Sequence, residues 1–246
     1  MRALVVSDLH SNAAALRAVF SRVRRKKYDE IVCLGDFVGY GAEPNKVLDA
    51  MRTARGRKLY IRGNHDRVAA GFDDGSAFNA AAREAAVWTR DRLSNPNRHF
   101  LQTLVVGPLR HDGVMLCHGS PFDEDEYVFT EPHAAQIFSI FDAPVILYGH
   151  THLPVIFSVG SGGDVSGTLV RGERSFRLDP ERRYLINPGS VGQPRDRNPD
   201  ASCAIVDTVR MTAQFLRVPY DLEKSQAAIL RAGLPRILAD RLAAGT

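Results

Sequence analysis

Side chains that bind metal ions recur at five places along the chain, each time just after a short apolar run. The side chains at these places are Asp8 and His10, Asp36, Asn64, His118, and His150 with His152. A single aspartate or histidine in such a place is usually a turn residue or a surface residue. Five coincidences of this kind predict instead that the seven side chains gather at a metal site, with no cysteine among its ligands.

The apolar runs predict the strands that would position these side chains. They lie in residues 3–8, 30–36, 58–64, 113–119 and 144–150. Their continuous apolar character indicates strands that are covered on both faces. Helix-like segments separate the first three runs, which predicts a mostly parallel sheet whose carboxyl ends line one crevice. Ligand binding is typical of that crevice.

The spacing of the paired ligands also has a physical purpose. In "DLH" and "HTH" the two ligand residues are two positions apart. In extended backbone such residues project to the same side, so each pair can reach one ion or two neighbouring ions. Gly35, Gly63 and Gly149 would allow the sharp chain reversals and the close packing beneath the site.

The rest of the chain is predicted to complete a single domain over residues 1–246. Short apolar segments after residue 150, separated by turns, predict antiparallel strands and hence a second sheet. Residues 221–243 are predicted to be helical, with an interruption at 233–235. The segment 67–110 is less regular, with one helix capped by Ser76, and is a candidate lid or pocket wall.

Composition limits the class of protein. The chain has 246 residues, 44% of them apolar, a net charge of +4 and three cysteines. This mild basicity suits anionic substrates and argues against nucleic acid as a partner. The cysteines, each in an apolar stretch, are expected to be buried reduced thiols. No segment resembles a signal peptide or a membrane span, so we expect a cytoplasmic location. The oligomeric state stays open.

Several short blocks, taken in order, resemble the calcineurin-like metallophosphoesterase superfamily. The blocks are "SDLH", "LGDFVGYG", "RGNHD", "CHGS" and "YGHTH", within about residues 1–195. Further blocks, "GYGAEPNKVL" and "INPGSVGQPRD", are similar to compact bacterial phosphoesterases related to diadenosine-tetraphosphatases. The resemblance implies an α/β (α+β) fold, a four-layer αββα sandwich. Two facing mixed sheets would be flanked by helices, with the metal site at the carboxyl ends of strands.

The resemblance also implies a role for each ligand candidate. One divalent ion would be held by Asp8, His10, Asp36 and His152. A second ion would be held by Asp36, Asn64, His118 and His150, so that Asp36 bridges the pair. His65 would be the catalytic histidine beside the substrate, and Asp66 would orient it and fix its tautomer. Asn12 is a weaker candidate for the mouth of the pocket.

The implied reaction is hydrolysis of a phosphate ester by a hydroxide that bridges two metal ions, with His65 as general acid. Mixed histidine, carboxylate and amide ligands suit manganese, iron, zinc, nickel or cobalt. We expect manganese to support the highest activity. The expected partner is a small phosphorylated substrate, with nucleotides among the options, and the protein is expected to be either a phosphodiesterase or a phosphatase.

Some assignments stay open at this stage. In residues 187–196, Arg195 could bind an anion, or the glycine-rich segment could only buttress the "GHTH" turn. Arg67, Arg83 and Arg90 could contact phosphate but are more typical of solvated helix positions. A nuclease and a non-catalytic scaffold with the same fold are the alternative functions. The complete ligand set and His65 argue against the scaffold.

Overall fold

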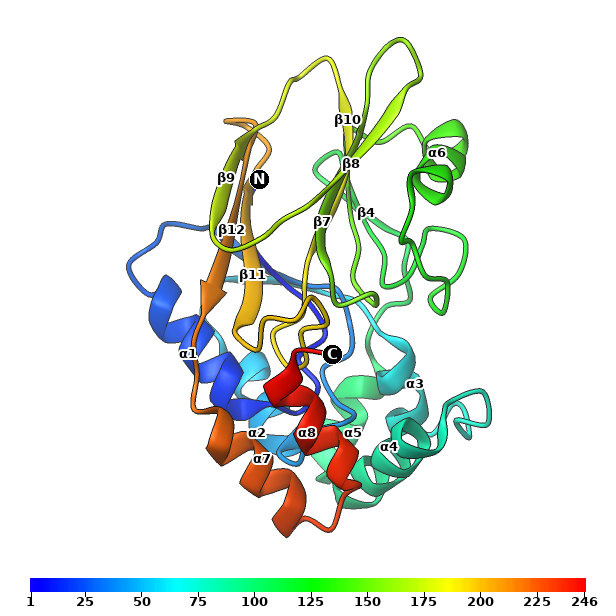
Figure 1. The fold of residues 1–246 in the computed structure, drawn as a ribbon. Helices are drawn as coiled ribbons and strands as arrows, with labels where there is room; N and C mark the ends of the chain where they lie inside the picture. The colour runs from blue at the N-terminus through cyan, green and yellow to red at the C-terminus, as the bar shows by residue number, and fades with distance from the viewer.

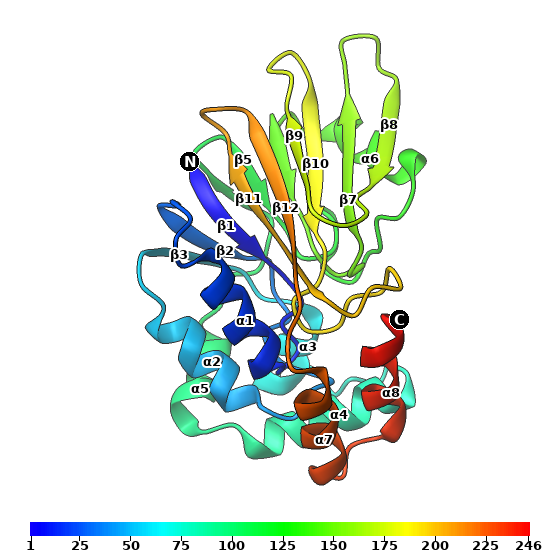
Figure 2. The same ribbon diagram turned by 60° about the vertical axis from the view of Figure 1, so that its left-hand side comes forward.

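A computed structural model describes all of residues 1–246 and shows two mixed six-stranded sheets that face each other (Figures 1 and 2). The first sheet, in spatial order, is β3 (Arg57–Tyr60), β2 (Glu30–Cys33), β1 (Arg2–Val6), β11 (Ala201–Asp207), β12 (Thr212–Val218) and β9 (Arg174–Arg177). The second is β4 (Leu109–His111), β5 (Val114–Leu116), β6 (Val145–Leu147), β10 (Arg183–Pro188), β7 (Pro154–Val159) and β8 (Val165–Leu169). The predicted fold class is confirmed.

Eight helices surround the sheets. They are α1 (Ala13–Val23), α2 (Pro44–Thr53), α3 (Asn64–Ala70), α4 (Ala80–Arg92), α5 (Asn95–Gln102), α6 (Glu131–Ile140), α7 (Leu222–Arg231) and α8 (Arg236–Ala244). Helix α1 packs against β11 and β12, whereas α6 packs against β7 and β8. Figures 1 and 2 show α4, α7 and α8 together at one end of the molecule, and in Figure 2 the arrowhead of β1 points toward that end. No helix has the length and apolar character needed to cross a membrane.

Apolar packing explains the four layers. Strand β1 turns Leu4 and Val6 toward α1 and α2, within a cluster of 25 buried residues. The alternate residues, Ala3 and Val5, belong to a cluster of 18 buried residues that joins the two sheets. A third cluster lies between the second sheet and α6. Strand β1 is therefore apolar at every position because both of its faces are covered.

The division between the sheets differs from the prediction. We expected one mostly parallel sheet from the first five strands and an antiparallel sheet from the residues after 150. Instead, β1, β2 and β3 are parallel neighbours in the first sheet, whereas β5 and β6 are parallel neighbours in the second. Each sheet is completed by later strands, since β11 pairs antiparallel with β1 and β10 pairs parallel with β6. Strand order depends on contacts between distant segments, which local patterns do not reveal.

Helix boundaries agree in part with the prediction. Asn12 caps α1 through its side chain, Pro44 opens α2, and the interruption between α7 and α8 lies where it was expected. Ser76 does not cap α4, because the Asn79 side chain accepts the hydrogen bond from the Ala82 amide. Four elements were not predicted, namely α3, α6, β4 and β9.

Candidate metal centre and active-site cleft

The predicted ligands come from loops at one end of the two sheets. The loops after β1 and β2 are tied together, with the Asp8 amide donating to Gly35 O at 3.1 Å and the His10 amide donating to Asp36 O at 3.0 Å. In the second sheet, the amide of Gly149 donates to His118 O at 2.7 Å. These backbone hydrogen bonds hold the loops in register, so the ligand positions follow from the fold rather than from one flexible segment.

The seven predicted ligand residues converge in two overlapping groups. Potential ligand atoms of Asp8, His10, Asp36 and His152 all lie within 4.8 Å of one another. Those of Asp36, His118 and His150 do the same. Asn64, the first residue of α3, places its Oδ1 at 3.1 Å from His118 Nε2. All seven side chains are buried, and Asp36 belongs to both groups.

Backbone carbonyls orient the histidine rings. Nδ1 of His10 lies 3.0 Å from Val38 O, and Nδ1 of His152 lies 2.6 Å from Gln193 O. Nδ1 of His118 lies 2.7 Å from Leu34 O. A carbonyl can only accept, so each Nδ1 carries a proton, and Nε2 of the neutral ring is the atom left to bind a metal ion. This arrangement is typical of histidines that bind a metal ion.

The donor atoms fit a cation. Nε2 of His10 and Nε2 of His152 lie only 3.0 Å apart, although both nitrogens carry lone pairs when the rings are neutral. The Oδ2 atom of Asp8 is buried and has no hydrogen-bond partner. Buried polar atoms without partners are costly. A divalent ion would satisfy all three atoms, so the residues present match the metal that the sequence predicts.

Electrostatics favour the ligand forms of His10, His150, His152 and Asp36, but not that of His118. Burial lowers the pKa of His10 and His152 well below the ordinary value and that of His150 to about 3, so these rings are neutral. Burial alone would raise the pKa of Asp36, but the neighbouring histidines, His118 first, hold it well below its usual range. Burial opposes charge on His118 too, yet Asp36 raises the pKa of that ring to about 10. Metal binding would release the His118 proton.

The backbone at the ligands is not extended, which corrects the explanation of the two-residue spacing. Asp8 and His10 have φ of 54° and 44°, and His150 and His152 have φ of 64° and 60°. Asp36 is also left-handed, at 55°. Strands β1 and β6 have already ended at Val6 and Leu147, so the chain turns sharply at each ligand. Non-glycine residues adopt this conformation at a cost, and it is often found at functional sites.

His65 lies beside the two groups, whereas Asp66 has a different place from the one predicted. The His65 ring packs at centroid distances of 4.5 Å from Tyr40 and 5.0 Å from His10. Its Nδ1 is buried without a partner. The Asp66 carboxylate instead accepts from the amides of Gly63 and Val38 at 3.0 and 3.2 Å. Asp66 therefore fixes the start of α3 and the neighbouring loop, and neighbouring rings hold His65.

Comparison with known proteins identifies the family. The sequence pattern of the "Calcineurin-like phosphoesterase superfamily domain" matches residues 1–211. The chain belongs to this superfamily. It is therefore a metal-dependent phosphoesterase, a hydrolase that acts on phosphoric ester bonds, and its buried histidine and aspartate cluster is able to hold the metal.

Relatives extend over the whole phosphoesterase chain. "Uncharacterized protein MJ0912" of Methanocaldococcus jannaschii is 35% identical over 246 residues, covering 98% of this chain and 97% of that protein. The crystal structure of a metallophosphoesterase from Sphaerobacter thermophilus is similar with a TM-score of 0.87 and 35% identity, covering 100% and 99% of the two chains. Hypothetical protein PH1004 from Pyrococcus horikoshii shares the fold, with a TM-score of 0.81 at 19% identity and coverage of 100% and 98%.

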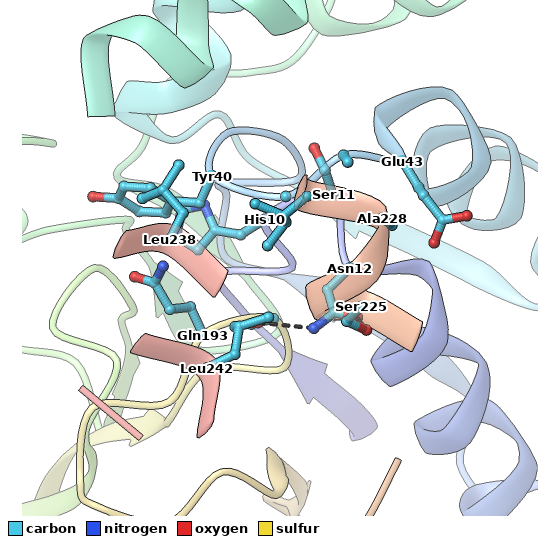
Figure 3. A pocket seen from close by; sticks show the side chains of 14 residues that line it. His10, Ser11, Asn12, Tyr40, Glu43, Gln193, Ser225, Ala228, Leu238 and Leu242 are labelled. Atoms are coloured by element: carbon cyan, nitrogen blue, oxygen red, sulfur yellow. Dashed lines mark hydrogen bonds between the residues drawn. The ribbon is translucent and has the colours of Figure 1, made fainter. Parts of the chain in front are cut away.

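Asn12 has a structural place in this phosphoesterase. It lines a small cavity of about 10 Å³ between the His10 loop and helices α7 and α8 (Figure 3). Its Oδ1 accepts from the Ala15 amide at 3.1 Å and from the Ser225 hydroxyl at 2.9 Å, and its Nδ2 donates to Gly192 O at 3.0 Å. A cavity of this size holds about one water molecule. These bonds give Asn12 a structural role, and its place at the mouth of a substrate pocket stays a prediction.

The segment 187–196 buttresses the site and also presents a cation. Asn187 Nδ2 donates to Gly149 O at 2.7 Å and to the Thr151 hydroxyl at 3.0 Å, which supports the "GHTH" turn as expected. Arg195 Nη2 donates to the Tyr40 hydroxyl at 3.3 Å and to Gln193 Oε1 at 3.2 Å. The Arg195 guanidinium has no carboxylate within 4.0 Å and so forms no ion pair. Its Nε is buried without a hydrogen-bond partner.

An open cleft of about 270 Å³ lies against the metal centre. It is lined by Tyr40, Asn64, His65, Ala77, Phe78, Asn79, Ala82, Asp125, Tyr127 and His150. The sequence indicated one wall, because residues 77–82 fall inside the segment 67–110. The aromatic residues Tyr40, Phe78 and Tyr127 were missed, since they lie in loops without periodic patterns. The available signals were the place of Tyr40 within "GDFVGYG", the place of Phe78 within the segment 67–110, and the position of Tyr127 shortly after "CHGS".

The arginines of the segment 67–110 do not line the cleft. Arg67 is paired with Glu124, Asp125 and Asp73. Arg83 Nε donates to Asp74 O at 3.3 Å, and both Arg83 and Arg90 line a separate surface pocket with Asp74. Helix α5 of the same segment packs into the core through Leu101. Residues 77–79 and 82 of the segment therefore line the cleft, and none of the three arginines does.

A third group of possible ligands, Glu30, His111 and Asp112, lies elsewhere. Glu30 begins β2, whereas Asp36 follows the end of that strand, so this group is at the opposite end of the sheet. His111 Nε2 is 3.3 Å from Glu30 Oε2, and Asp112 is exposed. Unlike the two groups at the other end of the sheet, this group is only partly buried, and it serves below as a control.

Proposed function

We propose that this phosphoesterase binds two divalent metal ions side by side and hydrolyses a small phosphate ester, either a diester or a monoester. The observation that carries the proposal is the overlap of two ligand groups at a single carboxylate, Asp36. His10 Nε2 and His118 Nε2 lie 3.6 and 3.5 Å from the same oxygen, Asp36 Oδ2. A carboxylate between two sets of histidines suits a bridge between two ions.

The chain's residues would hold the ions in two sets. Asp8, His10 and His152 would complete the first set, and Asn64, His118 and His150 the second. Two ions in such sites supply Lewis acidity for the phosphoryl group and lower the pKa of a water to about 7. We expect manganese to support the highest activity, since mixed nitrogen and oxygen donors accept several transition metals. Direct attack by water would invert the configuration at phosphorus.

His65 would act on the leaving group. It lines the open cleft, close to Asn64 and His150, but belongs to neither ligand group. Burial lowers its pKa to about 4, so the free protein holds a neutral ring. An anionic phosphate beside that ring would raise its pKa and favour a proton or hydrogen bond toward the leaving oxygen. Gly39 gives the ring space, because a Cβ there would approach His65 Nδ1 to 2.4 Å.

Arg195 would bind the phosphate. The Tyr40 ring packs on both His10 and His65, at 4.6 and 4.5 Å between centroids, and its hydroxyl accepts from Arg195. The guanidinium therefore lies one side chain away from the metal centre. Because it has no acidic partner, it is available for charge-assisted hydrogen bonds to phosphate oxygens.

The test uses protein freed of metal by a chelator and reloaded with manganese, nickel, cobalt or zinc. Bis-p-nitrophenyl phosphate and p-nitrophenyl phosphate report diester and monoester hydrolysis. We expect two equivalents of metal per chain and hydrolysis that returns only with metal. Folded protein that binds two ions yet hydrolyses neither ester would contradict the proposed reaction, and binding of one ion would contradict the dinuclear arrangement. Hydrolysis of a chiral, isotopically labelled phosphate ester would test for inversion.

A further inference from the structure

The cleft beside the metal centre is unusually aromatic for a site that binds phosphate. Tyr40, Phe78 and Tyr127 reach it from three separate segments: the loop after β2, the connection between α3 and α4, and the loop after β5. Phosphate recognition requires cations and backbone amides, and three aromatic rings add nothing to it. Aromatic residues at a pocket are instead suited to a flat apolar group of the ligand.

Tyr127 joins this cleft directly to the metal centre. Its ring stacks on His150 with 4.0 Å between centroids and 29° between planes, and on Phe129 at 5.1 Å and 7°. It is 42% exposed although it lies beside a buried centre. The Phe78 ring packs against His65, with 4.5 Å between the two ring centroids. A group attached to a phosphate at the centre would therefore meet aromatic rings immediately.

The loop that carries Tyr127 is held in place by charge and by burial. Arg62 Nη2 donates to Glu124 Oε1 at 2.9 Å, and Arg67 pairs with the same oxygen and with Asp125. Asp125 O lies 3.2 Å from His150 Nε2, and the Tyr148 hydroxyl donates to Val128 O at 3.2 Å. The aromatic surface is thus prepared before a ligand arrives, which reduces the entropy lost on binding.

We propose that this cleft binds the base of a nucleotide, with Tyr127 and Phe78 as the residues that recognise its ring. The proposal rests on the proposed function, because the metal centre would hold the phosphate of the same ligand. A nucleoside combines a planar ring with polar edges, and the cleft offers amide, carboxylate and hydroxyl groups from Asn79, Asp125 and Tyr40 beside its rings. A volume of about 270 Å³ fits one nucleoside better than an oligonucleotide.

The test compares ligands that share a phosphate and differ in the base. Inorganic phosphate, ribose 5-phosphate and AMP are titrated calorimetrically into the metal-loaded protein, and each is also tested as an inhibitor of bis-p-nitrophenyl phosphate hydrolysis. Stacking of a base on aromatic side chains changes affinity by about 5- to 150-fold. We expect AMP to bind at least about tenfold more tightly than ribose 5-phosphate.

Variants assign the effect to the aromatic rings. Tyr127→Leu and Phe78→Leu are each expected to bring the two affinities to within about twofold, whereas Tyr127→Phe keeps the ring and the preference. Phe122→Leu alters an exposed aromatic residue of the same loop that does not line the cleft, and it should leave the preference unchanged. The metal content of every variant is measured, because Tyr127 touches His150.

The outcomes separate this inference from the proposed function. If phosphate and ribose 5-phosphate bind but AMP binds no more tightly, base recognition is wrong and the phosphoesterase centre is unaffected. If the leucine variants keep the full preference for AMP, the assignment to this cleft is wrong. If none of the three ligands binds metal-loaded protein, the phosphate anchor is absent, and both the inference and the proposed centre fail.

Discussion

The metal centre and the cleft beside it are built in opposite ways. The seven ligand candidates are buried, sit on tight turns after strands or at the start of a helix, and take support from backbone hydrogen bonds between loops. The cleft is half-exposed, and its aromatic residues come from longer connections between elements. Asn64 and His150 belong to both regions, because each is a ligand candidate and also lines the cleft, and His65 lies between the two.

This difference separates general chemistry from specificity. A buried centre on rigid turns can keep the same donor atoms in proteins with different substrates. Loops can change without disturbing the two sheets, so the leaving group is recognised where the fold constrains the chain least. Substitutions in the centre should therefore affect all phosphate esters alike, whereas substitutions in the cleft should change the preference among esters.

The largest effect is expected from Asp36→Asn. The amide removes the negative charge that both ligand groups share, so we expect metal content to fall from two ions to one or none. Activity toward every ester should fall by more than about a hundredfold. Loss of a residue that only hydrogen-bonds to a metal ligand costs up to about a hundredfold, and loss of a ligand shared by both ions should cost more. Metal analysis and hydrolysis assays of the folded variant measure both effects.

His111→Ala is the matched control for that measurement. It disrupts the third group of possible ligands, at the other end of β2, and should leave two bound ions and full activity. Loss of a bound ion in this control would show that metal counts do not report on the centre alone. An Asp36→Asn variant that keeps two ions would contradict the bridging role of the carboxylate.

A more selective effect, without loss of metal, is expected from His65→Gln. Glutamine can still donate a hydrogen bond but cannot transfer a proton, so kcat should fall by about 100- to 10,000-fold for esters with poor leaving groups. Esters of p-nitrophenol need less help from an acid and should lose less. Steady-state kinetics with leaving groups of different pKa check this dependence. A variant that binds no metal would show that His65 supports the centre and is not the acid.

Arg195→Met is expected to weaken substrate binding by a smaller factor. Loss of charge-assisted hydrogen bonds to phosphate should reduce kcat/KM by about 10- to 100-fold, and by a similar factor for aromatic and alkyl esters. Kinetics with both kinds of ester measure this. Arg197→Met changes an exposed neighbour without an acidic partner and should have no effect. A strong change in preference between the esters would show that Arg195 recognises the leaving group in the cleft and not the phosphate at the metal centre.

The convergence of the ligand candidates could be predicted because each of them is encoded locally. Asp8, Asp36 and His118 each follow a strand by a few residues, and any fold that brings those strand ends together also brings the side chains together. The role of Asp66 was not predictable in this way. Its two acceptor bonds go to Gly63 and Val38, and Val38 is 28 residues away in another loop.

The parts of the fold that were mispredicted depend on distant partners. Strand β11 pairs with β1 through Ile205 and Leu4, about two hundred residues apart, which no local pattern indicates. The same limit applies to the cleft. Tyr127 looks like an ordinary exposed loop residue until His150 is placed beneath it. Rings that meet through loops leave no periodic signal, so the chemistry was more visible in the sequence than the specificity.

The last prediction compares the buried strand layers with the exposed cleft through the chemical reactivity of their side chains, and it needs no substitution. Cys33, Cys117 and Cys203 are buried and unpaired, as the sequence predicted. Burial raises the pKa of the Cys203 thiol to about 12, so at pH 8 the thiolate is nearly absent and a disulfide reagent cannot reach the sulfur. We expect no thiol to react in the native protein within minutes and three to react after unfolding in guanidinium. Tyr127, the one tyrosine of the cleft that is well exposed, should instead be nitrated in the native state. A native thiol that reacts as fast as this tyrosine would show that the strand layers around the centre open as readily as the cleft.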